Sequence, residues 1–126
     1  MYRSMMQIYV KNSNQAVAFY QNAFGAEVLC NHQNDDGTVG HAELNVFGQI
    51  LAICETREKE VSVGNSMQFC LHMGEGKEAL VKKMYNALRE DCIKLTAPIT
   101  NPGECPWSPC LFGLIDKFGV SWCIFV

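Results

Sequence analysis

Three polar side chains alternate along one short stretch and could act together on a bound molecule. His41, Glu43 and Asn45 occupy every second position of the segment 39–47, and largely apolar residues fill the positions between them. Since the side chains of a β-strand alternate between its two faces, this pattern predicts a half-buried strand with the three polar groups on one face. An imidazole beside a carboxylate can perform general acid–base catalysis, and both groups can donate to a metal ion.

A cavity that this face lines without performing chemistry is the alternative. Gln7 and Gln68 stand in two predicted strands and are expected to add amide groups to the same lining. Polar groups that satisfy one another, or that face solvent, account for the pattern as well as catalysis does. We favour cavity lining and keep His41 and Glu43 as catalytic candidates. Two further histidines, one beside a turn and one at a strand end, are expected to be exposed and are not chosen as ligands: His32 and His72.

A proline-rich loop carries two cysteines and a tryptophan that invite a metal or redox interpretation. Zinc sites generally use two close pairs of ligands, and no second pair accompanies Cys105 and Cys110. Their spacing is also wrong for a thioredoxin-type CxxC motif. We therefore expect the loop to lay Trp107 over the mouth of the cavity, where it could stack on a flat or apolar ligand. Packing of Trp107 on a neighbouring module is the alternative.

The chain has seven cysteines, most of them within apolar, strand-like runs, as at Cys54, Cys70 and Cys123. Buried free cysteine behaves as a small hydrophobic residue. An odd count in such runs fits a reduced, intracellular setting better than a disulfide scaffold. Cys123 is counted among the cavity residues because of its place in the last strand. Without a cationic neighbour in the sequence, it is expected to be a buried, inert thiol.

The elements that must position these residues occur twice in the same order: strand, helix, three strands. Phe47-Gly48 and Phe118-Gly119 each form a turn that leads into a buried strand, and Met67-Gln68 falls where Met6-Gln7 falls. Gly25 is a natural stop for the first helix. In the first half the strands are expected at 5–10, from residue 28, and at 39–47 and 50–54, with a helix over 16–24. In the second half they are expected from residue 67 and at 93–97, 111–115 and 120–126, with a helix over 75–90.

This repeat predicts an α+β fold in which each half covers one face of a small, mostly antiparallel sheet with one helix. The 126 residues, 48% of them hydrophobic, suffice for one domain over 1–126, with module 1 at about 1–60 and module 2 at about 61–126. Basic residues are few and scattered and the formal net charge is -3, which argues against a nucleic-acid partner. The absence of a long apolar run or a signal-peptide pattern argues against a membrane and predicts a cytoplasmic protein.

Five features follow one another along nearly the whole chain: AVAFY at 16–20, FGAE at 24–27, GHAEL at 40–44, Trp107, and DKFGVSW at 116–122. In this order they resemble the motifs of the vicinal oxygen chelate superfamily, which includes glyoxalase and bleomycin-resistance proteins, and of its PhnB-like branch in particular. The resemblance implies paired βαβββ modules that form a curved, mostly antiparallel half-barrel sheet with a central cavity. Members commonly bind a divalent metal and act on vicinal oxygens. Others hold a small molecule without metal, and many are homodimers.

The family's metal ligands, usually His, Gln or Glu, align with Met5, Ala52, Ser66 and Cys123 in this chain. Of these, Cys123 is the residue suited to a borderline-soft metal such as zinc. The resemblance therefore implies a small-molecule-binding protein, expected to be a homodimer, with no confident cofactor. A divalent-metal-dependent lyase, isomerase or dioxygenase that uses His41 and Glu43 is the alternative, and a cavity filled by dimerisation is a third. The expected cavity residues are Gln7, His41, Glu43, Asn45, Gln68, Trp107 and Cys123.

Overall fold

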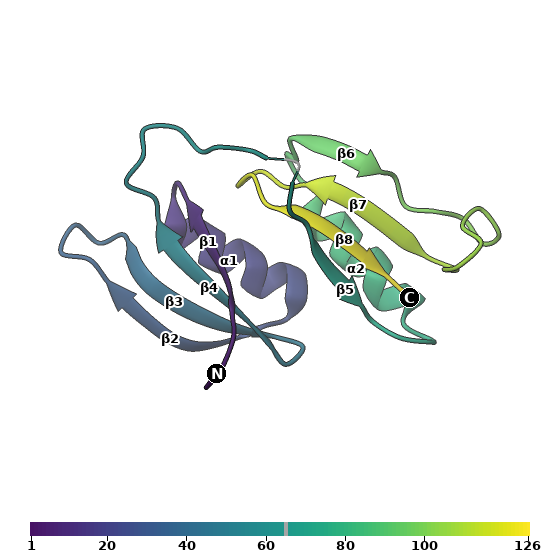
Figure 1. Cartoon of the computed structure of the whole chain (residues 1–126), viewed down its shortest axis with the longest axis horizontal. Coiled ribbons are helices and arrows are strands. Elements are labelled where there is room, and N and C mark those ends of the chain that lie inside the picture. The colour runs from purple at the N-terminus through teal and green to yellow at the C-terminus, as the bar shows by residue number, and fades with distance from the viewer. Residues whose placement is uncertain (65) are drawn as a thin grey trace. The chain divides into compact units, whose positions relative to one another are not determined.

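The computed structural model describes residues 1–64 and 66–126 and divides into two compact units, Met1–Val61 and Ser62–Val126 (Figure 1). Each unit contains one helix and one four-stranded sheet, in the chain order strand, helix, three strands. The α+β class and the βαβββ plan of each half are therefore as the sequence predicted. That both halves serve a single domain stays a prediction.

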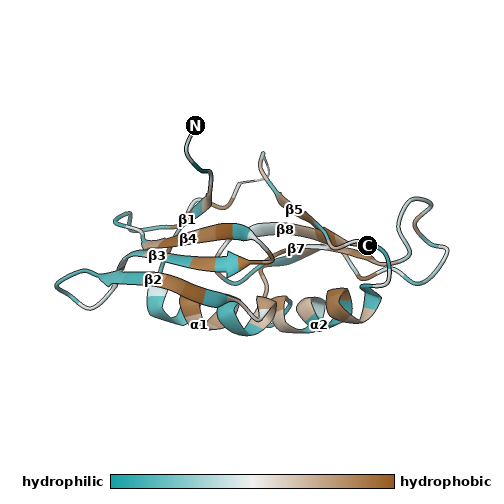
Figure 2. Cartoon of the chain, turned by 90° about the horizontal axis from the view of Figure 1, so that it is seen from below, coloured by the Kyte–Doolittle hydropathy of each residue, from teal (hydrophilic) through white to brown (hydrophobic). Residues whose placement is uncertain are grey.

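Unit 1 builds its sheet from β1 (Met6–Val10), β2 (Glu27–Gln33), β3 (Val39–Val46) and β4 (Gln49–Glu55) in the spatial order β1-β4-β3-β2. The β1–β4 pair is parallel, and the other two pairs are antiparallel. Helix α1 (Ser13–Phe24) lies along one face of this sheet (Figure 2). The helix follows from apolar residues at three-to-four spacing, all buried, and it ends at Gly25, whose left-handed φ of 60° a glycine adopts without strain. The buried apolar residues of α1 are Ala16, Val17, Tyr20, Ala23 and Phe24.

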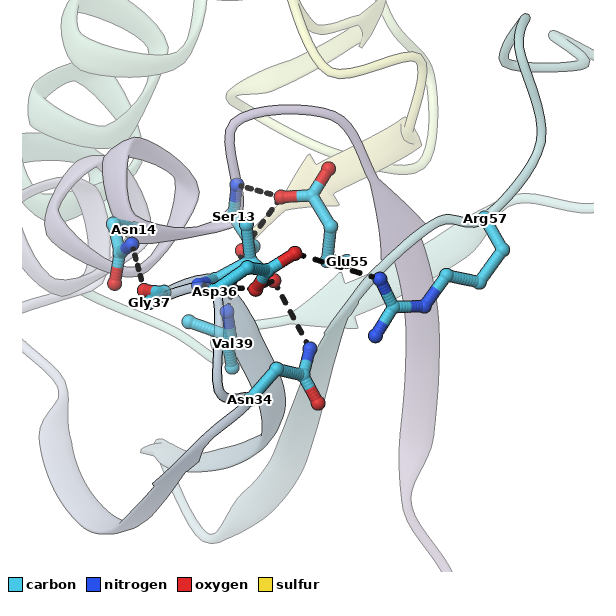
Figure 3. A network of polar contacts seen from close by, with 9 residues as sticks. Ser13, Asn14, Asn34, Asp36, Gly37, Val39, Glu55 and Arg57 are labelled. Carbon is cyan, nitrogen blue, oxygen red and sulfur yellow. Dashed lines mark hydrogen bonds and ion pairs between the residues drawn. The ribbon is translucent and has the colours of Figure 1, made fainter.

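A polar network fixes the start of α1 against the sheet (Figure 3). Glu55, at the end of β4, accepts hydrogen bonds through Oε1 from the backbone N–H of Ser13 at 3.0 Å and from its hydroxyl at 2.8 Å. The Ser13 hydroxyl oxygen in turn accepts the N–H of Val39, the first residue of β3, at 2.9 Å. A carboxylate at a helix N-terminus satisfies a free N–H and is favoured by the helix dipole. These contacts hold β3 and β4 in position below the helix.

Unit 2 repeats the plan with β5 (Phe69–His72), α2 (Glu78–Leu88), β6 (Lys94–Ala97), β7 (Leu111–Ile115) and β8 (Ser121–Phe125). The strand order is β5-β8-β7-β6, again with one parallel pair, β5–β8. A buried carboxylate closes the β7–β8 hairpin. Asp116 accepts the N–H groups of Phe118 and Val120 at 2.9 and 3.1 Å and the indole N–H of Trp122 at 2.9 Å. Trp122 is completely buried in the core of this unit.

The second half departs from the sequence prediction most clearly at α2 and at the start of β5. Helix α2 begins at Glu78 and ends at Leu88, inside the predicted span of 75–90. Gly74 and Gly76 precede it with φ values of 90° and 82°, which lie outside helical geometry. The residues Met67 and Gln68 precede β5 instead of forming its beginning.

The strand register also corrects the predicted match between the two halves. Leu51 and Trp122 are each the third residue after a hairpin glycine, and their parallel partners are Met6 and Phe69. Phe69, and not Met67, is therefore the counterpart of Met6. It follows that Cys70 corresponds to Gln7, and that Gln68, in place of Ser66, corresponds to Met5.

No helix in the described parts of the chain, 1–64 and 66–126, is long and apolar enough to cross a membrane.

Candidate functional site

The candidate site lies on the face of the unit 1 sheet that points away from α1. Along β3, Ala42 and Leu44 are completely buried on the helix-facing side, so His41 and Glu43 point to the other face. The register places Glu43 opposite Ala52 of β4, and it places Gln7 of β1 on the other side of Ala52. Three strands thus bring side chains to one surface, as the alternation in 39–47 predicted.

A bidentate ion pair covers Glu43. The two terminal nitrogens of Arg3 donate to its carboxylate oxygens, with Nη1 to Oε1 at 2.6 Å and Nη2 to Oε2 at 3.0 Å. Glu43 is 6% exposed although it lies on the polar face. The hydrogen bonds from Arg3 and then from His41 lower the pKa of Glu43 from 4.5 to about 2, so Glu43 is a carboxylate at neutral pH. The same contact raises the pKa of Arg3.

His41 extends this ion pair into a chain of contacts. Its Nε2 lies 2.8 Å from Oε2 of Glu43, and its Nδ1 lies 3.9 Å from the sulfur of Cys54 on β4. Since the ionised carboxylate can accept but not donate, we assign the ring proton to Nε2, which leaves Nδ1 as an acceptor toward the thiol. Burial raises the pKa of Cys54, which therefore rests as a thiol. The successive contacts therefore run from Arg3 through Glu43 and His41 to Cys54.

Sequence reasoning selected His41 and Glu43 but missed two members of this chain. Arg3 stands before β1, 40 residues from its partner in sequence, so no local pattern connects the two. Cys54 was interpreted as an ordinary buried thiol. Its signal was its position in β4, because antiparallel pairing with β3 brings it beside His41.

Two other predicted residues of unit 1 make contacts of their own. The amide nitrogen of Gln7 donates to the hydroxyl oxygen of Tyr9 at 2.6 Å, on the same face of β1. Tyr9 is the parallel partner of Cys54. Asn45 is exposed, and its Oδ1 accepts the N–H of Gly48 at 2.7 Å, which stabilises the β3–β4 turn. A role for Asn45 in a cavity stays a prediction.

In unit 2, the predicted residues Gln68 and Cys123 lie together at the β5–β8 pair. Cys123 is the parallel partner of Cys70, and Gln68 donates to the hydroxyl of Ser121 at 3.5 Å and to the carbonyl of Trp122 at 3.4 Å. Burial first, and then Cys70, raise the pKa of Cys123 to about 11, so this thiol is protonated at neutral pH. Cys123 is half-buried, whereas the sequence predicted full burial. Cys70, also predicted to be buried, is exposed.

Trp107 lies at the β8 side of unit 2 with 65% of its surface exposed. Its ring meets the ring of Phe125 edge to face at 5.4 Å, and Phe125 stacks on His72 at 4.6 Å. The following Ser108 is buried, and its hydroxyl oxygen lies 2.9 Å from the backbone oxygen of Cys110 and 2.8 Å from that of Val126, within hydrogen-bond distance of both. This anchor holds the loop on its own unit. His72 is exposed, as is His32, which faces His41 from β2.

The positions that the family resemblance assigns to metal ligands do not hold a complete set of donors. With the corrected register these are Met5, Ala52, Gln68 and Cys123, and Ala52 has no donor atom. Met5 offers a thioether, which is a soft ligand. Across residues 1–64 and 66–126, no group of three or more His, Cys, Asp or Glu side chains is arranged to hold a metal ion.

No family model and no curated protein matches the chain by sequence. Solved structures do match. A PhnB protein from Bacillus cereus aligns with a TM-score of 0.80 and 21% identity, over 98% of each chain. A protein from Pseudomonas aeruginosa aligns with a TM-score of 0.79 and 18% identity, over 99% of this chain and 97% of that one.

A third match is a mutant of the fosfomycin resistance protein FosX from Listeria monocytogenes, in complex with Mn(II) and 1S,2S-dihydroxypropylphosphonic acid. Its TM-score is 0.66 at 14% identity, over 98% of this chain and 87% of that one. These alignments span both units of the chain. The chain therefore has the same fold as these proteins, a PhnB protein among them, which is the fold that the resemblance of the sequence motifs implied.

Proposed function

We propose that this protein binds a small molecule on the polar face of unit 1 and does so without the divalent metal of its superfamily. The observation that carries the proposal is the Arg3–Glu43–His41 chain, in which a nearly buried carboxylate is held by two charged or polar partners on an open sheet face. Preorganised polar groups on a rigid sheet are the usual means by which a site orients a small ligand.

The exposed guanidinium of Arg3 indicates the ligand class. Arg3 is 45% exposed and gives Glu43 two of its five N–H donors. The remaining donors suit an anionic oxygen, and the hydroxyl of Tyr9 suits a hydroxyl group. The FosX structure holds a hydroxylated phosphonic acid on the same fold. We propose a small hydroxylated acid as the ligand.

Thermal unfolding in EDTA, with a panel of small hydroxylated carboxylic and phosphonic acids, tests this proposal. A ligand at one hundred times its dissociation constant stabilises the native state by about 2.7 kcal/mol and raises the melting temperature by several degrees. We expect the shift to disappear in Arg3→Gln and to persist in Arg57→Gln. Arg57 is the matched control because it is an exposed arginine that contacts Asp36 away from this face. A shift that Arg3→Gln leaves unchanged contradicts the proposal.

A metal-dependent enzyme is the second candidate, and the 2.8 Å contact between His41 and Glu43 is the observation that favours it. His41 and Glu43 could supply two of the four ligands of a four-coordinate metal site. Elemental analysis of protein purified without chelator separates the two candidates. We expect less than one equivalent of divalent metal, and a stoichiometric metal that His41→Gln removes supports the enzyme instead.

We also propose that the protein is a homodimer and that it is located in the cytoplasm. All seven cysteines are free, which suits a reducing compartment. Light scattering across a range of protein concentrations tests the dimer, and a monomer at every concentration contradicts it.

A further inference from the structure

The arrangement around Cys54 has the parts of an activated nucleophile: a thiol, a base within reach, and a third group that orients the base. The thiol sulfur lies 3.9 Å from Nδ1 of His41, and Nε2 of the same ring lies 2.8 Å from Glu43. We propose that Cys54 is a nucleophile that adds to small conjugated carbonyl compounds, with His41 as its base. This inference rests on the proposed binding function for the access of a small molecule to this face.

Glu43 and Arg3 prepare His41 for this role. The two hydrogen bonds from Arg3 keep Glu43 ionised, and an ionised Glu43 keeps the ring proton on Nε2. The lone pair of Nδ1 then faces the thiol. A base that is oriented by a third group is the general logic of nucleophile–base pairs. Glu43 and Arg3 are accordingly positioning residues.

Tyr9 supplies a group for the carbonyl side of the reaction. It is the parallel partner of Cys54 on β1, so the two side chains are neighbours on the same face. The Tyr9 oxygen accepts a hydrogen bond from Gln7 at 2.6 Å, which leaves the hydroxyl hydrogen to be donated. A carbonyl oxygen is the group that such a donor fits. Cys54 is 8% exposed, which restricts the partner to a small compound.

The proposed step is an addition, so no group leaves. His41 takes the thiol proton as the sulfur bonds to the β-carbon of the conjugated carbonyl compound. The electron pair of the carbon–carbon double bond shifts to give an enolate, whose oxygen accepts the Tyr9 hydroxyl. The proton on His41 then returns to the α-carbon. The adduct contains every atom of both reactants, and no oxidant or reductant is needed.

The test is the reaction of the native protein with acrylamide, followed cysteine by cysteine with peptide mass spectrometry across a range of pH. We expect the Cys54 rate to fall by about tenfold or more in His41→Gln, since general bases contribute about 10² to 10⁴ in rate. We expect no change in His32→Gln, which removes the exposed histidine that faces His41 from β2. Cys110, which is 1% exposed, is the internal control for opening of the fold.

The pH profile separates a base from a structural support. The wild-type rate at Cys54 should contain a step that His41→Gln removes, while the melting temperature and circular dichroism of the variant stay close to wild type. Equal Cys54 rates in wild type and His41→Gln overturn the inference. So does a native Cys54 that acrylamide leaves unmodified while the denatured chain reacts.

A Cys54→Ser variant distinguishes this failure from failure of the binding proposal. If hydroxylated acids raise the melting temperature of both proteins and Cys54 does not react, the thiol inference alone is overturned. If Cys54 reacts in the His41-dependent way and no acid raises the melting temperature, the proposed ligand class is wrong and the thiol inference is supported.

Discussion

The two sheets follow one plan, but their helix-free faces have different chemistry. Glu43 of β3 pairs with Ala52, the fourth residue after Gly48, and Gly113 of β7 pairs with Cys123, the fourth residue after Gly119. Gly113 is therefore the counterpart of Glu43. By the same register Leu111 and Ile115 replace the polar side chains that flank Glu43, and Phe125 and His72 stand at the positions of Cys54 and Tyr9.

The opposite faces, which pack beneath the helices, are alike. Leu44, Leu51 and Ile53 in unit 1 correspond to Leu114, Trp122 and Ile124 in unit 2, and all six are completely buried. Since successive residues of a strand point to opposite faces, the core can stay apolar while the other face changes. The two sheets therefore share a buried apolar face and differ in the side chains of the face that points away from the helix.

A carboxylate placed on the unit 2 sheet, at the counterpart of Glu43, should cause the largest loss of folding stability. We expect Gly113→Glu to destabilise the protein by about 4 kcal/mol or to unfold it, because an unpaired charge enters a buried position without a counterpart of Arg3. A Cβ at this position would also lie 2.7 Å from Oγ1 of Thr96. Urea denaturation followed by circular dichroism measures the loss.

Gly113→Ala is the matched control, since it introduces the crowding without the charge. A loss in Gly113→Ala equal to that in Gly113→Glu means that sterics alone separate the faces, which contradicts the electrostatic part of the comparison.

The second largest effect should be a difference in stability between variants of the β7–β8 and β3–β4 hairpins. Asp116→Ala leaves three buried or partly buried donors without their acceptor, and we expect a loss of about 3 kcal/mol in the free energy of unfolding. Asn45→Ala removes one exposed contact to Gly48, and we expect about 1 kcal/mol. Chemical denaturation of both variants measures the difference. Equal losses contradict the assignment of Asp116 to the core.

The polar face of the unit 1 sheet should make the folding stability fall at low pH. The folded-state pKa of Glu43, about 2, is below its ordinary value of 4.5, so its ion pair stabilises the fold above that value and is lost as pH falls toward 2. Melting temperatures from pH 6 to pH 2 should therefore fall more steeply in wild type than in Glu43→Gln. The effect is modest because Arg3 is 45% exposed and screened by salt. Parallel curves for the two proteins contradict it.

The smallest change in stability should come from the apolar face. Trp107 is 65% exposed, so Trp107→Ala should change the free energy of unfolding by about 0.5 kcal/mol. Chemical denaturation of wild type and Trp107→Ala measures this change. A loss as large as that in Asp116→Ala contradicts it.

Local patterns were sufficient for most of the fold. The alternation over 39–47, the glycine stop at Gly25 and the two Phe-Gly turns each depend on neighbours in the sequence, and the structure confirms them. The predicted start of α2 at residue 75 was wrong, because Gly74 and Gly76 take φ values outside helical geometry and the helix begins at Glu78.

The site was less predictable because its contacts join distant residues. The Arg3–Glu43 ion pair and the Cys54–His41 contact depend on strand register, which a single sequence does not contain. The predicted match of Met67 with Met6 failed for the same reason. Composition suggested that Cys70 is buried, but the direction in which a strand residue points decides its exposure, and Cys70 lies on the open face.

The loop between β6 and β7 is longer than its equivalent between β2 and β3, and this sets the two copies out of phase. No single offset in residue number aligns the two units, so comparing the sequence with itself detects the repeated order of elements only as several weak matches. The added length includes an exposed turn in which Asn101 donates to Glu104 at 2.7 Å. This turn is exposed and lies outside the paired strands, which makes residues 101–104 a suitable place to graft an epitope or a fluorescent reporter.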